Sequence, residues 1–210
     1  DDNPGFANTS FDETFSESTV DGHSVLVVPA WQSINKNQAS EGPAFSIHFN
    51  VAEQADNAGL LRHEMMHGLG AVNMLGNFTV SSTGPVMGPM PGDTTTASLY
   101  DLSLVDLDGM PLLSQYDEAA QTFTVQTYRI ETTLTEWMDG AGGVSFRGIS
   151  DDGGDFDMRC GTFPAGEDVG ALVLNEPSDV MSAGVHPSWN TLAEPDRAFL
   201  RAMRYTLNEN

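Results

Sequence analysis

The chain has 210 residues, of which 40% are hydrophobic and 18% are charged, a composition typical of a globular protein rather than a disordered one. Its 30 acidic residues against 8 lysines and arginines give a formal net charge of −22. This excess of negative charge repels nucleic acid and anionic membranes, so we expect neither as a partner, and no apolar run approaches the ~20 residues of a membrane span. The single cysteine, Cys160, excludes an internal disulfide.

The first third of the chain predicts two strands and one helix. The apolar run 25–28 is expected to form a buried strand that stops at Pro29. The segment 45–49 alternates apolar and polar residues, which predicts a half-buried strand. A helix is expected from about residue 58 to residue 69, followed by Gly70 as its stop signal.

The remainder is expected to contain β structure, irregular segments and one more helix. Residues 99–113 alternate around the turn signal Asp108-Gly109, which predicts a hairpin, and residues 122–135 have β-type composition. Residues 139–157 are rich in glycine and aspartate, so we expect them to be irregular. A final helix is predicted to open at Glu194-Pro195-Asp196.

The predicted first helix carries the segment His63-Glu64-Met65-Met66-His67. Residues four apart lie one above the other on the same helix face, so both imidazoles can reach one zinc ion. Glu64 lies beside that metal without binding it, where it can take a proton from a zinc-coordinated water that attacks a carbonyl. This register of residue types predicts a zinc-dependent hydrolase with His63 and His67 as ligands and Glu64 as general base.

A family resemblance extends this motif. Residues 63–73 read HEMMHGLGAVN, and this stretch resembles the HExxHxxGxxH helix of the metzincin zinc peptidases. The loop Asp179-Val180-Met181-Ser182-Ala183-Gly184 is similar to the metzincin Met-turn, which places a methionine beneath the zinc. The segments 100–109 and 190–200 also resemble bacterial secreted members that have a long insert before the Met-turn, similar in plan to leishmanolysin.

The eleventh position of the motif departs from the family, because Asn73 stands where metzincins have His or sometimes Asp. Asn73 is our expected third ligand through its carbonyl oxygen, although amide oxygen binds zinc weakly. Alternatives are the carboxylates of Asp168 or Glu176, or His186, which follows the Met-turn. These alternatives stay open.

The resemblance implies an α+β, metzincin-like zincin: a small mixed sheet, an active-site helix, a long irregular and β-rich insert, and a C-terminal helix. It implies one catalytic domain over residues 1–210, with an N-terminal lobe of residues 1–73 and a C-terminal lobe of residues 74–210. The implied activity is that of a secreted, monomeric zinc endopeptidase that hydrolyses peptide bonds of extended protein substrates. If residues 45–49 form an edge strand, substrate is expected to pair with that edge.

Two other functions remain open. The missing third histidine favours a metalloprotease-fold binding module with little or no turnover. The metal and glutamate could also hydrolyse a non-peptide amide, because the motif itself does not select peptide bonds. A thermolysin-like plan, in which Glu176 on a helix binds the metal, is disfavoured by the adjacent Pro177.

Two further features carry weaker expectations. The acidic segment 151–157 offers carboxylates that could bind Ca²⁺, although its spacing is not that of a helix–loop–helix site. Cys160 lies downstream of the active helix, unlike the inhibitory cysteine of metzincin propeptides, and we expect it to be a buried or idle thiol.

Overall fold

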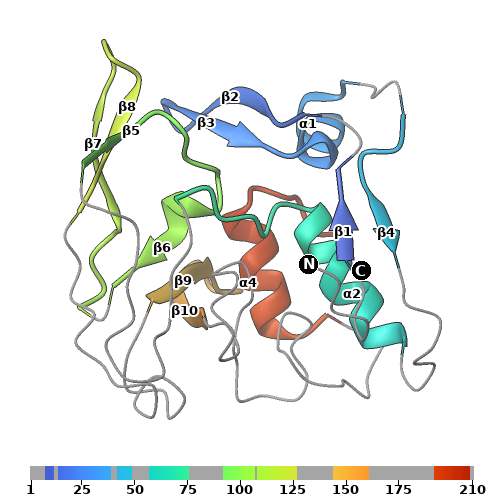
Figure 1. The fold of residues 1–210 in the computed structure, drawn as a ribbon. Coiled ribbons are helices and arrows are strands. Elements are labelled where there is room, and N and C mark those ends of the chain that lie inside the picture. Colours follow the sequence, from blue (N-terminus) through green and yellow to red (C-terminus); the bar gives the residue numbers. More distant parts are fainter. Residues whose placement is uncertain are drawn as a thin grey trace, which may run out of the picture.

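The computed structural model describes residues 8–11, 14–38, 42–48, 57–75, 92–106, 108–126, 144–160 and 192–208. Figure 1 shows the arrangement of its helices and strands. In chain order these are β1 (Asn8–Ser10), β2 (Ser16–Val20), β3 (His23–Val27), α1 (Pro29–Lys36), β4 (Ser46–His48), α2 (Asn57–Gly68), β5 (Gly92–Thr94), the 3-10 turn η1 (Asp101–Ser103), β6 (Leu104–Val105), β7 (Leu113–Asp117), β8 (Thr122–Val125), β9 (Val144–Ile149), β10 (Asp155–Cys160) and α4 (Glu194–Ala202).

The described strands form four small sheets rather than one. Their orders are β1-β4, β2-β3, β5-β8-β7 and β10-β9-β6, and each of these pairings is antiparallel. The α+β class is therefore confirmed, whereas the single small mixed sheet is not found among the described residues. The described strands are short, 2–6 residues each, and each of them pairs with only one or two others.

Aromatic side chains from distant segments build the centre of the core. Tyr100 stacks on Phe146 of β9 with ring centroids 4.8 Å apart, and Phe146 contacts Phe199 of α4 at 5.3 Å. All three residues are fully buried. Burial of aromatic groups of this size contributes strongly to stability, so α4 is held against β9, at the centre of the view in Figure 1.

The strand predicted at residues 25–28 is confirmed for the most part, because β3 covers His23–Val27. The strand ends before Pro29 as expected, and Pro29 also begins a helix that was not predicted, α1. Proline suits the first helical turn, since its fixed φ is already helical and its missing N–H has no partner to lose there. The buried Trp31 of α1 donates from Nε1 to the carbonyl of Met203 at 2.8 Å, which ties α1 to the end of α4.

The prediction of irregular structure over residues 139–157 is wrong for residues 144–149 and 155–157, where β9 and β10 form a regular hairpin. Residues 139–143 of that prediction lie outside the described residues. Along β9, Val144, Phe146 and Gly148 are buried and the residues between them are not. Asp151, Asp152, Gly153 and Gly154, which contributed to the prediction of irregular structure, form the connecting turn, where Gly153 has φ +84°. Turn chemistry had therefore hidden the two-residue alternation of the strand.

Three other predicted elements are confirmed. Helix α2 matches the expected helix within one residue at either end, and α4 begins at Glu194 as expected. The Asp108-Gly109 turn is present, with Gly109 at φ +73° and its N–H donating to the carbonyl of Asp106. Within the described part of the chain, no helix combines the length and apolarity needed to cross a membrane.

Candidate metal centre

The two histidines of the helix motif converge. His63 and His67 lie one turn apart on α2, and their Nε2 atoms are 3.2 Å apart, with ring planes at 79°. Two nitrogens that bind one tetrahedral zinc at about 2.0–2.1 Å lie about 3.3 Å from each other. The observed separation therefore fits two ligands of a single zinc ion.

The ring of His67 is oriented by the chain that follows the helix. Its Nδ1 lies 2.7 Å from the carbonyl oxygen of Ala71. A carbonyl can only accept, so Nδ1 carries the hydrogen and, in the neutral ring, Nε2 presents its lone pair. Imidazole ligands of metals commonly have their other nitrogen fixed in this way. His67 is thus set in the tautomer that a metal requires.

Glu64 follows His63 by one residue and is buried, with 5% of its surface exposed. The hydroxyl of Thr9 on β1 lies 2.8 Å from its carboxylate oxygen Oε2 and 2.7 Å from its backbone carbonyl oxygen. Strand β1 packs on α2 and pairs with β4, which also contacts α2 (Figure 1). The carboxylate expected to act as a base therefore accepts a hydrogen bond from a neutral hydroxyl.

The turn after α2 depends on Gly70. This residue has φ +119°, and a Cβ built there would lie 2.6 Å from Cε of the buried Met203. Only glycine adopts this conformation readily and fits this space. The sharp turn brings Ala71 back against the helix, with its N–H donating to the carbonyl of Met66 at 3.0 Å. The expected stop of the helix at this glycine is confirmed.

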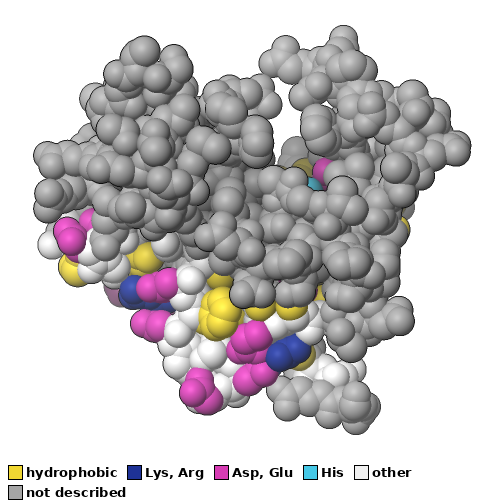
Figure 2. Space-filling view, turned by 90° about the horizontal axis from the view of Figure 1, so that it is seen from below, with side chains coloured by type: hydrophobic (Ala, Val, Ile, Leu, Met, Phe, Trp, Pro, Cys, Tyr) yellow, Lys and Arg dark blue, Asp and Glu magenta, His cyan; other side chains and the backbone are white. Residues whose placement is uncertain are grey.

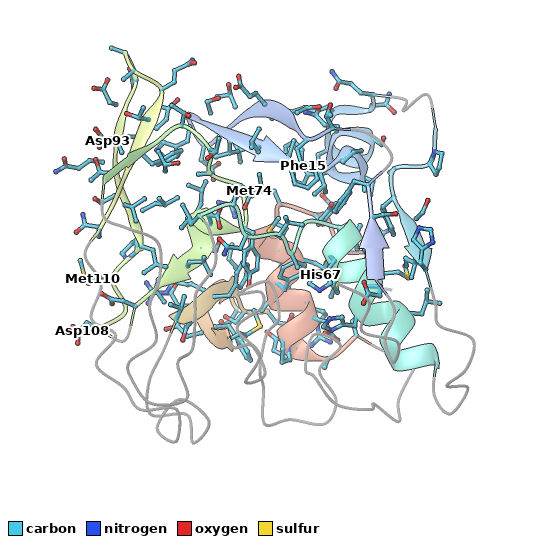
Figure 3. The ribbon with its side chains drawn as sticks, in the orientation of Figure 1. Phe15, His67, Met74, Asp93, Asp108 and Met110 are labelled. Atoms are coloured by element: carbon cyan, nitrogen blue, oxygen red, sulfur yellow. The ribbon has the colours of Figure 1, made fainter. Side chains whose placement is uncertain are left out.

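Asn73 lies in the segment that follows this turn. Its side-chain oxygen, the atom expected to bind metal, accepts a hydrogen bond from the backbone N–H of Leu75 at 2.9 Å. This short-range bond closes an Asx turn and fixes the amide within its own loop. Figure 3 shows the neighbouring Met74 above His67 in the centre of the molecule.

The other candidate third ligands, Asp168, Glu176 and His186, lie outside the described residues, as does Met181 of the predicted Met-turn. Within the ranges that the structure does describe, no group of three or more histidine, cysteine or acidic side chains is placed to hold a metal. His63 and His67 thus form a two-residue pair there, and the third ligand remains a prediction. Cys160 ends β10, paired with Val144.

The acidic segment 151–157, considered for Ca²⁺, has arginine partners. Arg197 binds Asp151 at 2.8 Å and Arg147 binds Asp157 at 2.9 Å, and Arg201 also contacts Asp151. Hydrogen bonds from Arg197 are the main reason that the pKa of Asp151 lies below its usual range. Figure 2 shows basic side chains beside acidic ones on the face seen from below. Calcium binding at this segment would have to compete with these pairs.

Two groups at this site were not found from the sequence. The Thr9 hydroxyl reaches Glu64 across 55 positions, and the Ala71 carbonyl acts through its backbone. The chain gives no local signal for either group, because one contact depends on how β1 docks and the other on the path of the turn.

Comparison of the chain with protein-family models, with curated proteins and with solved structures finds no match. The resemblance to metzincins therefore rests on the motif residues themselves.

Proposed function

We propose that this protein is a zinc-dependent hydrolase of peptide bonds, with His63 and His67 holding the metal and Glu64 acting as general base and acid. The observation that carries the proposal is the convergence of the two Nε2 atoms at 3.2 Å on one helix face. Zinc held there would polarise a carbonyl as a Lewis acid and lower the pKa of a coordinated water to about 7.

The contribution of the protein is to orient ligands and move one proton. Ala71 sets the tautomer of His67, and Thr9 limits the rotation of the Glu64 carboxylate. In the proposed reaction, Glu64 takes a proton from water as the water oxygen bonds to the carbonyl carbon. The C–N bond then breaks, and Glu64 passes the proton to the leaving nitrogen. Peptide bonds are proposed as the substrate on the strength of the metzincin resemblance.

Where the substrate lies is part of the same proposal. Among the described strands, β4 belongs to a two-stranded sheet with β1, and we propose this strand as the one that holds the substrate. An extended peptide could add to the edge of such a sheet through backbone hydrogen bonds. We propose a protein or peptide substrate in this extended form.

The Glu64→Gln variant tests the mechanism. It keeps the size of the buried side chain but removes the base, so we expect normal folding, retained zinc and a loss of casein cleavage of about 10²–10⁴-fold. Zinc content is measured by metal analysis and cleavage with and without a chelator. Glu118→Gln is the matched control, because Glu118 is an exposed glutamate outside the site.

The result also separates the alternatives. Unchanged cleavage in Glu64→Gln removes Glu64 from its proposed role. Stoichiometric zinc without cleavage of any protein would favour the binding module, and cleavage of small amides alone would favour a non-peptide hydrolase.

A further inference from the structure

A buried carboxylate that the proposed reaction does not use lies close to the metal centre in the fold. Asp101, at the start of η1, has 0% of its surface exposed. Its oxygens accept the backbone N–H of Met74 at 3.0 Å and that of Ser98 at 2.7 Å. Met74 belongs to the segment that follows the active helix. Asp101 thus reaches across 27 positions to hold that segment.

Ser98 holds the same segment from its other side. Its hydroxyl donates to the carbonyl of Val72 at 2.6 Å and accepts the N–H of Asp101 at 3.1 Å. Ser98 is itself buried, with 5% of its surface exposed. The two side chains therefore bind the residues immediately before and after Asn73, and they brace each other.

This arrangement is energetically costly. The groups of Ser98 and Met74 that bond to the carboxylate are neutral. Burial raises the pKa of Asp101 to about 7, against the opposing effect of these hydrogen bonds. A buried charge without a counter-charge in these bonds lowers stability at neutral pH. Titratable groups with a strongly shifted pKa are enriched at functional sites.

The held segment carries two groups that matter to the proposed site. Ala71 accepts the Nδ1 hydrogen of His67, and Asn73 is the expected third ligand. Between them Val72 is fixed at its carbonyl by Ser98 and at its N–H by the carbonyl of Gly70. Movement of this segment would therefore turn the imidazole of His67 and displace Asn73 together.

We propose that Asp101 and Ser98 are positioning residues of the metal centre. They clamp residues 72–74, so that the Ala71 carbonyl stays bonded to Nδ1 of His67 and the segment that carries Asn73 keeps its path after the helix. This inference rests on the proposed function. It assigns no catalytic step to either residue, since both act through backbone groups of the segment.

Ser98→Ala is the main test, because it removes one hydroxyl and little volume. Zinc affinity is measured by competition with a chromophoric chelator, and the visible spectrum of the Co²⁺-loaded protein reports the geometry around the metal. We expect zinc affinity about 10-fold weaker or more, as for other residues that orient metal ligands, with altered Co²⁺ bands. In the metal-free protein, amide hydrogen exchange at residues 72–74 should become faster.

Tyr116→Phe is the matched control. It removes the hydrogen bond of 3.1 Å that the Tyr116 hydroxyl of β7 accepts from the backbone N–H of Ser24 of β3, outside the clamped segment. This variant should keep the wild-type zinc affinity and Co²⁺ spectrum. Asp101→Asn, which keeps the buried shape but replaces one acceptor oxygen by a donor, should behave like Ser98→Ala.

The outcomes separate this inference from the function on which it rests. Folded Ser98→Ala and Asp101→Asn proteins with wild-type zinc affinity and Co²⁺ spectra overturn the positioning role alone. If both variants unfold, the pair supports the fold as a whole and the positioning role is again overturned. A wild-type chain that binds neither metal overturns the proposed function, and with it this role.

Discussion

Two aspartates, Asp101 and Asp151, each hold a loop of this protein, one from a buried position and the other from an exposed one. Asp101 is fully buried and accepts backbone N–H groups, and burial raises its pKa to about 7. Asp151, in the turn between β9 and β10, is exposed and bound by Arg197 and Arg201, which lower its pKa. The first loop follows the candidate metal-binding helix, and the second fastens α4 to a hairpin.

The difference lies in what each loop has to do. An exposed ion pair is screened by water and salt, and it tolerates small changes in geometry. A buried carboxylate that accepts two N–H groups fixes direction as well as distance, but it loses hydration energy. In this protein the second, costlier arrangement is found beside the site, where an imidazole has to keep its orientation.

The largest expected effect concerns the pH dependence of stability. The folded-state pKa of Asp101, about 7, exceeds its ordinary value of 3.8, so the folded protein binds the extra proton between these values. Its contribution to the free energy of unfolding therefore falls as pH rises from about 4 to about 7. At about 1.4 kcal/mol per pH unit, the fall amounts to a few kcal/mol.

Denaturant unfolding of wild type and Asp101→Asn across this range measures the effect, because the other titrating groups are common to both chains. As pH rises, the unfolding free energy of the wild type should fall relative to that of Asp101→Asn. A difference that stays constant from pH 4 to pH 7 would contradict the cost assigned to Asp101. Asp151 should show the opposite slope, since its lowered pKa stabilises the fold above its ordinary value and that contribution is lost as pH falls.

A pair of glycine substitutions compares the two loops directly. Gly70 and Gly153 both have positive φ, +119° and +84°, so alanine at either position costs about 1–3 kcal/mol of backbone strain. A Cβ at Gly70 also meets Met203, whereas nothing lies within 4 Å of one at Gly153. We expect Gly70→Ala to be the more destabilising and also to weaken zinc binding.

Thermal unfolding and the chelator competition together check this expectation. Gly153→Ala should lose stability while its zinc affinity stays unchanged. Equal zinc affinities in the two variants would mean that the turn after α2 is not coupled to the metal centre.

The smallest effect is expected for Asp151→Asn. It removes the exposed pairs with Arg197 and Arg201, so the denaturant midpoint should move less than in either glycine variant. The change should shrink further in 1 M NaCl, with zinc affinity unaltered. A large, salt-independent loss would show that this region depends on its charges as strongly as the region around Asp101.

The sequence by itself determined those features that arise from local spacing. The four-residue interval between His63 and His67 brings their rings together on any α-helix, and Gly70 marked the turn that ends it. The Asp108-Gly109 turn and the opening of α4 were predictable for the same reason. In each case the physical cause lies within a few residues along the chain.

Only the tertiary structure decided which distant groups support the site. In the sequence, Asp101 is a polar residue at the start of a predicted hairpin. Nothing beside it in the chain indicates that it is buried and bonded to Met74. Thr9 meets Glu64 only because β1 docks on α2. Burial and long-range hydrogen bonds depend on how separate elements pack, and packing is a property of the whole chain rather than of any short segment.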